Sequence, residues 1–233
     1  MERIVIVVAM DKELATFKKE LNNLQQINLR NREIYLGSLN GHEIILAKTG
    51  IGKVAAGSFL TTLIERYHPT LVINMGIAGG FNKDIKTLDT IVVTKAVYSD
   101  VDMTSDEFSN LAYGQLEEMP PYFTIDEKLI KLVHNIVGDD AYYGTIATGD
   151  QFVTDYERCK KIVESYFNDL NVLAFDMESA AFLHVCYLYD IPCLVIRTIS
   201  DIIGSTTPLD YSNFSTIASN KVGTICKKLI DNM

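Results

Sequence analysis

Two kinds of hydrophobic pattern alternate along the chain. Short runs rich in valine and isoleucine, apolar over most of their length, predict buried strands. They cover residues 4–8, 43–48, 71–75, 90–97, 143–147, 172–175 and 193–199. Between them, apolar residues recur at helical spacing over residues 54–67, 127–136, 155–167, 179–189 and 213–230. This alternation predicts a three-layer αβα fold of the α/β class, in which helices cover both faces of a central mixed, largely parallel sheet.

The organisation of the chain favours one domain. No linker rich in proline, glycine or serine divides it, and it contains no internal repeat or low-complexity tract. We therefore expect residues 1–233 to form a single domain. The least regular segment is 99–123, which holds acids, aromatic residues and a Pro-Pro pair. A loop of this length inside a compact domain is usually functional or mobile.

Composition and charge narrow the function classes. Of the 233 residues 48% are hydrophobic and 22% are charged, and the formal net charge is −9. Such an acidic chain repels a phosphate backbone, so we expect no nucleic acid partner. The apolar run at the N-terminus is shorter than a signal peptide or a membrane span requires. We therefore expect a cytoplasmic protein that makes no membrane contact.

Cysteine and histidine spacing predicts no metal site. The four cysteines form no C-x-x-C pair, and the four histidines are scattered without the spacing of metal ligands. We expect the cysteines to be reduced and to pack as small hydrophobic residues.

Two glycine-rich segments follow predicted strands. Residues 49–57, TGIGKVAAG, formally match the dinucleotide pattern G-x-G-x-x-A, but they follow the second predicted strand instead of the first. The acid that should follow about 20 residues later is also missing, so no cofactor is predicted. A tight strand-to-helix turn with Lys53 in solvent is the alternative reading. Residues 74–82, NMGIAGGFN, predict a second turn that can act as a binding wall, without any lysine or arginine for a phosphate.

Three acids follow predicted strands of the same sheet. Glu13, Glu178 and Asp201 come after the strands at 4–8, 172–175 and 193–199. Each alone could be a helix cap or a solvated loop residue. Ligands of open α/β sheets bind beyond the carboxyl ends of the strands, so acids that converge there favour a site. Cleavage of a glycosidic bond requires one acid to protonate the leaving group and another to activate water.

Six motifs carry a family resemblance over nearly the whole chain. They resemble, in the same order, those of bacterial 5′-methylthioadenosine/S-adenosylhomocysteine nucleosidases of the nucleoside phosphorylase superfamily. The motifs are AMDKE at 9–13, TGIGKVAA at 49–56, NMGIAGG at 74–80, TGDQFV at 148–153, FDMESAA at 175–181 and RTISD at 197–201. The resemblance implies a nucleoside phosphorylase-like fold. It also implies hydrolysis of the N-glycosidic bond of 5′-methylthioadenosine, S-adenosylhomocysteine and, as a further candidate, 5′-deoxyadenosine, which releases adenine.

The resemblance also implies a role for individual residues. Asp201 would protonate N7 of adenine, Glu13 would activate the attacking water, and Glu178 would bind the ribose hydroxyls. Met177 would lie along the ribose, Phe152 would stack on adenine, and the backbone of Val153 would read the edge of the base. The remaining site residues would be Ile51, Ile77, Ala78 and Gly79 on the ribose and water side, Arg197 and Ser200 beside the acids, and Tyr211 near the 5′ substituent. Asp176, which stands one residue before Met177, is not part of this set, and our own interpretation is that it is structural.

Three alternatives use the same site. A purine nucleoside phosphorylase would use phosphate, and members that hold phosphate resemble a pattern with arginine three residues before serine or threonine. Asn74 and Ile77 occupy those positions here, which favours water. A noncatalytic nucleoside-binding module would not need Glu13 and Asp201 together. A nucleosidase acting on a futalosine-type substrate would differ only in the pocket for the 5′ substituent.

The family forms homodimers in which the neighbouring subunit closes the 5′ pocket, and segment 99–123 is the matching region. Met103 and Phe108 would contribute to the neighbour's site. The segment departs from the family pattern because it is a few residues longer and has Glu117 where a proline is common. We therefore make no prediction of the preference between methylthio and homocysteinyl substrates.

Overall fold

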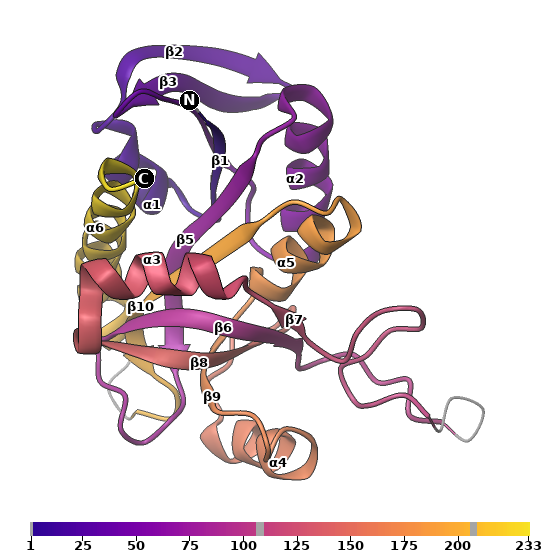
Figure 1. Ribbon diagram of the computed structural model, residues 1–233. Helices are drawn as coiled ribbons and strands as arrows, with labels where there is room; N and C mark the ends of the chain where they lie inside the picture. Colours follow the sequence, from indigo (N-terminus) through magenta and orange to yellow (C-terminus); the bar gives the residue numbers. More distant parts are fainter. Residues whose placement is uncertain (1, 106–109, 206–208) are drawn as a thin grey trace.

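The computed structural model describes residues 2–105, 110–205 and 209–233 and has the α/β architecture that the hydrophobic pattern predicts. In chain order the main elements are β1 (Arg3–Val8), α1 (Asp11–Lys18), β2 (Asn22–Leu29), β3 (Arg32–Leu39), β4 (His42–Lys48), α2 (Lys53–Tyr67), β5 (Leu71–Gly80), β6 (Thr90–Tyr98), β7 (Phe123–Thr124), α3 (Glu127–Val137), β8 (Ala141–Thr148), α4 (Tyr156–Tyr166), β9 (Val172–Asp176), α5 (Ser179–Leu188), β10 (Cys193–Ile202) and α6 (Leu209–Asp231). Every predicted strand and helix is present (Figure 1).

The strands form one mixed sheet in the order β10-β6-β8-β9-β5-β1-β4-β3-β2. Strand β1 pairs in parallel with β4 and β5, and β5 pairs in parallel with β10. The strands from β5 to β10 form a closed part of the sheet, because β10 pairs with β6 as well as with β5, and the far end of β5 pairs antiparallel with β9. The end of β5 is therefore surrounded by strands on both sides.

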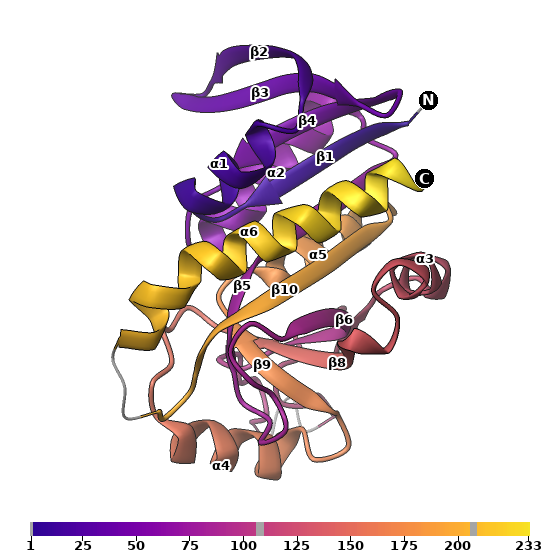
Figure 2. The same cartoon turned by 90° about the vertical axis from the view of Figure 1, so that its left-hand side faces the viewer.

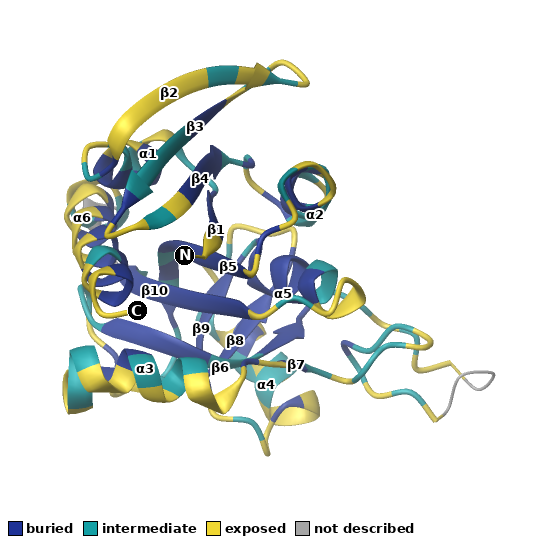
Figure 3. Ribbon diagram, turned by 45° about the horizontal axis from the view of Figure 1, so that its top comes forward, coloured by how far each residue is buried: buried dark blue, intermediate teal, exposed yellow. Residues whose placement is uncertain are grey.

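Helices cover both faces of the sheet. Helix α6 packs against β10 and β5 and is flanked by α1 and α3, whereas α2 and α5 pack together on the opposite face (Figure 2). Gly223 of α6 lets α1 approach closely, since a Cβ atom there would lie 2.4 Å from Thr16 Cγ2. The central strands are buried along their length, whereas β2 is exposed at the edge of the sheet (Figure 3).

The hydrophobic pattern missed β2, β3, the short β7 and α1. Strand β2 has the sequence NNLQQINL and is largely exposed, so its polar residues carry no strand pattern. Strand β2 forms because it pairs antiparallel with β3, which is itself paired antiparallel with β4. Helix α1 spans only 8 residues, and only Leu14 and Phe17 among its apolar side chains are buried core residues. Elements this short take their stability from tertiary packing more than from local pattern.

The predicted turn at 74–82 is wrong, because β5 continues through Gly80. The glycines let the strand run where side chains would collide. A Cβ atom at Gly80 would lie 2.8 Å from Ile202 Cδ1, and one at Gly79 would lie 3.2 Å from Ile203 Cγ1. The segment therefore remains a wall of the sheet edge, but an extended one. No helix among the described residues is long and apolar enough to cross a membrane.

Candidate active site

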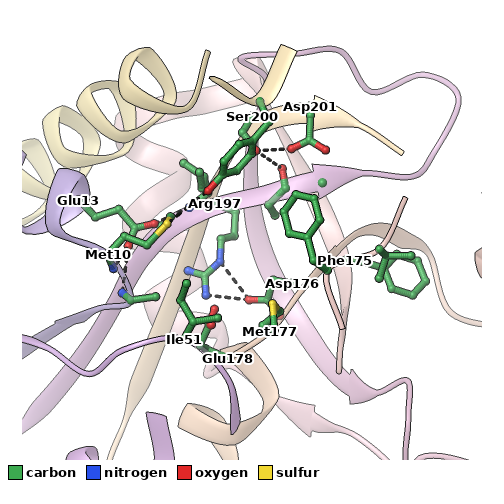
Figure 4. A pocket seen from close by; sticks show the side chains of 18 of the residues that line it. Met10, Glu13, Ile51, Phe175, Asp176, Met177, Glu178, Arg197, Ser200 and Asp201 are labelled. Carbon is green, nitrogen blue, oxygen red and sulfur yellow. Dashed lines mark hydrogen bonds and ion pairs between the residues drawn. The ribbon is translucent and has the colours of Figure 1, made fainter. Parts of the chain in front are cut away.

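A cleft opens at the ends of β1, β5, β9 and β10. The loops after β4 and β8 and the first turn of α6 complete its walls, and Figure 4 shows the side chains that point into it. The lining includes every site residue predicted from the sequence except two: Glu13, Ile51, Ile77, Ala78, Gly79, Phe152, Val153, Met177, Glu178, Arg197, Ser200, Asp201 and Tyr211. Met103 does not line the cleft, and Phe108 lies outside the described residues.

Glu13 is held in the cleft by backbone N–H groups on both sides. It lies in the first turn of α1, and its Oε2 accepts hydrogen bonds from the backbone N–H of Ala9 and of Met10, each at 2.9 Å. Its Oε1 accepts one from the N–H of Ile77 in β5 at 3.1 Å. Burial raises the pKa of Glu13, although Arg197 and these backbone groups lower it in part. The carboxylate is thus fixed in position and is a stronger proton acceptor than an exposed glutamate.

Glu178 is the residue just before α5, and its carboxylate faces the loop after β4. Its Oε1 accepts a hydrogen bond from the backbone N–H of Gly52 at 2.9 Å. Burial, together with the neighbouring charge of Asp176, raises the pKa of Glu178 to about 7, against the partial opposition of Gly52 and Arg197. A carboxylate of this kind favours partners that donate hydrogen bonds or carry positive charge, because both stabilise its ionised form.

Asp176 and Arg197 form a buried ion pair on the floor of the cleft (Figure 4). Both side chains are 2% exposed, and Arg197 Nη2 lies 2.8 Å from Asp176 Oδ2. Thr148 and Ser179 also donate hydrogen bonds to Asp176, and Arg197 donates one to Asn74. This network supports the interpretation of Asp176 as structural, since its oxygens already have several donors.

Asp201 reaches the cleft at a bulge in β10. The register between β10 and β5 shifts between Ile199 and Asp201, so Ser200 has no partner in the ladder. Bulges of this kind redirect side chains and are common beside active sites. Ser200 Oγ donates a hydrogen bond of 2.5 Å to Asp201 Oδ1 and also lies 3.3 Å from the carbonyl oxygen of Ala78. Asp201 therefore projects over the glycine end of β5.

The upper walls of the cleft are apolar and partly exposed. Phe152 packs edge-on against Tyr211 with the ring centroids 5.4 Å apart. The hydroxyl of Tyr211 donates to Met10 Sδ at 3.4 Å, which joins α6 to the start of α1. Ile51 and Phe152 are 57% and 61% exposed. The walls can therefore cover a flat aromatic ligand whose other end meets the carboxylates.

Several lining residues were not predicted from the sequence. They are Ala9, Met10, Met75, Gly76, Gln151, Phe175 and Ile203. Asn74 was noted in the sequence, but its hydrogen bond with Arg197 was not predicted. Met10, Gln151 and Phe175 each stand within the motifs already noted, so motif position is the signal that could have found them. Ile203 follows β10 and has no such signal. The described residues contain no group of three or more His, Cys, Asp or Glu side chains that could hold a metal ion.

Comparison with known proteins agrees with this geometry. The family model of the Phosphorylase superfamily matches residues 3–231. A 5′-methylthioadenosine/S-adenosylhomocysteine nucleosidase from Psychromonas ingrahamii is 34% identical over 99% of both chains.

Two solved structures share the fold. The nucleosidase of the same kind from S. pneumoniae, in complex with the transition-state inhibitor MT-ImmA, has a TM-score of 0.91, 29% identity and 99% coverage of both chains. An aspartate-to-asparagine variant from Helicobacter pylori, with 5′-methylthioadenosine in the active site, has a TM-score of 0.92, 27% identity and full coverage of both chains. The chain belongs to the phosphorylase superfamily and, within it, to the 5′-methylthioadenosine/S-adenosylhomocysteine nucleosidases.

Proposed function

We propose that the protein hydrolyses the N-glycosidic bond of 5′-methylthioadenosine and S-adenosylhomocysteine, and that it releases adenine and the thioribose product. The observation that carries this proposal is the convergence of Glu13, Glu178 and Asp201 in one cleft. Family membership supports it, as do the relatives whose structures hold 5′-methylthioadenosine or a transition-state inhibitor.

Asp201 is the proposed general acid. It donates a proton to N7 of adenine as the bond from C1′ to N9 breaks, so that adenine leaves as a neutral molecule. General acid catalysis contributes about 10²–10⁴-fold to such a reaction. Two aspartates line the cleft, but Asp176 is bound to Arg197, Thr148 and Ser179. Asp201 projects from the bulge in β10 over Gly79 at the glycine end of β5, and this position makes it the better candidate to face a ligand.

Glu13 is the proposed general base. Water attacks C1′ as the ribose becomes cationic, and Glu13 takes a proton from that water. The three backbone N–H groups keep the carboxylate in place, and its raised pKa favours proton transfer to it. Glu178 accepts hydrogen bonds from the ribose hydroxyls. In its ionised form it also stabilises the positive charge that develops on the ribose.

The cleft favours water over phosphate as the second substrate. Among its described lining residues Arg197 is the one cation, and it is engaged with Asp176 and Asn74. Asn74 also donates a hydrogen bond to the carbonyl of Val7 at 3.0 Å, so both its amide groups are already engaged within the protein. A phosphate dianion would therefore meet two carboxylates, Glu13 and Glu178, and no available cation. This arrangement supports hydrolysis over phosphorolysis.

We also propose that two copies of the chain associate over the exposed wall of the cleft, as the family resemblance implies. Val54, in the first turn of α2, is 80% exposed, and Ile51 lies on the adjoining loop. Met103 does not line the cleft of its own chain, which leaves it available to a neighbouring copy. Sedimentation analysis of the protein and of Val54→Asp tests this: the variant should be monomeric if Val54 is at the interface.

Incubation of the purified protein with 5′-methylthioadenosine, with and without phosphate, tests the reaction. Chromatography separates adenine from the sugar product. Adenine with free methylthioribose, formed at the same rate without phosphate, is the expected result. Adenine that appears only with phosphate, together with a sugar 1-phosphate, would replace this proposal by a phosphorylase. No adenine at all would favour a futalosine-type substrate or a binding module.

A further inference from the structure

Lys53 follows the glycine turn after β4, and its side chain is not in free solvent as the alternative reading of that turn expected. Its Nζ lies 2.6 Å from Asp100 Oδ1 and 3.9 Å from Asp150 Oδ2. The side chains of Lys53 and Asp100 are only 21% and 19% exposed. Each of the three residues belongs to a different segment: the start of α2, the segment after β6 and the loop after β8. We call these three residues the clamp.

Backbone hydrogen bonds reinforce the clamp. The N–H of Lys53 donates to Asp150 Oδ1 at 2.7 Å, and the N–H of Asp150 donates to Asp100 Oδ2 at 2.8 Å. The N-cap residue of α2 is Gly52, which has no side chain to satisfy the first N–H groups of the helix. Asp150 therefore supplies from another loop the carboxylate that a helix N-terminus favours.

The two loops joined by the clamp are also in close contact. Gly52 has a φ of +94°, and a Cβ atom there would lie 2.9 Å from Asp150 Oδ1. Any larger residue would push the loops apart and would be strained at this φ. The spacing between the loops is thus set by charge, by hydrogen bonds and by the absence of a side chain at this one position.

Each loop carries one wall of the cleft. On the first, Ile51 lines the cleft and the N–H of Gly52 holds Glu178 at 2.9 Å. On the second, Phe152 and Val153 line the cleft only two and three residues after Asp150. The ribose side and the base side of the cleft are therefore tied together through residues that do not themselves line it.

We propose that Lys53, Asp100 and Asp150 are positioning residues for nucleoside cleavage: they fix the separation between the wall that holds the ribose and the wall that holds the base. This inference rests on the proposed function, because it assumes a ligand that touches both walls. The clamp also holds the start of segment 99–123 through Asp100.

The test compares a ligand that spans both walls with one that occupies the base side alone. In Lys53→Ala, the KM for 5′-methylthioadenosine should rise by about tenfold or more, because misplaced binding groups weaken the nucleoside complex. The affinity for adenine, measured by calorimetry, should change less than threefold. Lys53→Arg keeps the charge and should restore most of the loss.

Two further variants separate positioning from general damage. Asp100→Asn removes the charge but keeps an oxygen for the N–H of Asp150, and it should raise the KM in the same sense as Lys53→Ala. Lys131→Ala removes an exposed ion pair, with Glu127 at 3.7 Å, and serves as the matched control with no change in KM. Equal weakening of adenine and nucleoside binding in the clamp variants would overturn the inference, as would an unchanged KM. A wild-type protein that does not cleave 5′-methylthioadenosine would overturn the proposed function itself.

Discussion

The floor and the upper walls of the cleft differ in how firmly they hold their side chains. On the floor, Glu13, Asp176 and Arg197 are almost wholly buried, and each has several hydrogen-bond partners. On the upper walls, Ile51 and Phe152 are more than half exposed, and Phe152 packs against the ring of Tyr211. Groups proposed for the chemistry are thus positioned before a ligand arrives, which is the arrangement that stabilises developing charge most effectively.

Two buried carboxylates that stand two residues apart in sequence, Asp176 and Glu178, also differ in how they are held. Asp176 is saturated by its ion pair with Arg197 and by hydroxyl donors, whereas Glu178 has one backbone donor, and its pKa is raised to about 7. A buried group with a full set of partners contributes to the fold. A buried group with few partners costs stability and is available to a ligand. Four predictions break or sharpen this comparison.

The largest effect is expected for Asp201→Asn. Loss of the proposed proton donor should lower kcat for 5′-methylthioadenosine by about 10²–10⁴-fold. Steady-state kinetics measure this loss, and thermal unfolding should show little change. Asp84→Asn, at an exposed position, is the control and should keep wild-type kcat. A kcat for Asp201→Asn within tenfold of wild type would remove Asp201 from the role of general acid.

Glu178→Gln should mainly lower activity, whereas Asp176→Asn should mainly lower stability. Glu178→Gln should lower kcat/KM by about 10²-fold or more, because it removes the charge that faces the ribose. Asp176→Asn should keep a substantial part of the activity per folded molecule. It should lower the free energy of unfolding by about 3–5 kcal/mol, since Arg197 loses its buried charge partner. Kinetics and denaturant unfolding of both variants provide the measurements, and equal activity losses would contradict the assignment of Asp176 as structural.

The dependence of stability on pH should reveal the raised pKa of Glu178. The folded pKa of about 7 exceeds the usual 4.5, so ionisation of Glu178 destabilises the fold as the pH rises between these values. Below this window the carboxyl is protonated in both states and has no such cost. Glu178→Gln should therefore gain stability over wild type from about pH 5 to pH 7, by at most about 3 kcal/mol, with a constant gain above pH 8. Melting temperatures across this range would refute the idea if the two curves stayed parallel.

The smallest effect on binding or activity is expected for a substitution on the upper walls of the cleft. Phe152→Leu removes the aromatic face proposed to stack on adenine and should weaken adenine binding by about tenfold, equivalent to about 1.4 kcal/mol. Its melting temperature should hardly change, because the side chain is 61% exposed. Calorimetric titration with adenine gives the affinity. Unchanged binding would assign the base to another part of the cleft.

How well a site residue could be predicted depends on whether its role is visible in the local sequence. The acids Glu13, Glu178 and Asp201 could be selected because they follow predicted strands, and the ends of such strands meet at one edge of a sheet. The expectation for Asp201 was wrong in one respect, because β10 continues through a bulge to Ile202 and includes this residue. Ser179 and Thr148 gave no such signal. They matter because folding brings them to Asp176 across separate elements, as the hydrogen bonds of both hydroxyl groups show.

Lys53 illustrates the same limit. In sequence it is one lysine after a glycine turn, and solvent exposure is the ordinary expectation for such a residue. Its two acidic partners stand 47 and 97 residues further along the chain. Local pattern carries no information over such separations, whereas the parallel pairing of β6 with β8 brings Asp100 and Asp150 together.

By itself the sequence determined the kind of fold and the kinds of chemical group at the sheet edge. Apolar runs of strand and helix length are local properties, because burial of one face must repeat with the period of the element. Only the tertiary structure decided that β5 extends through Gly80, that β2 and β3 join the sheet, and that Arg197 is paired with Asp176. These features depend on which backbones and charges meet at close range, and the balance of pairing, desolvation and steric contact that selects them exists only once the chain has folded.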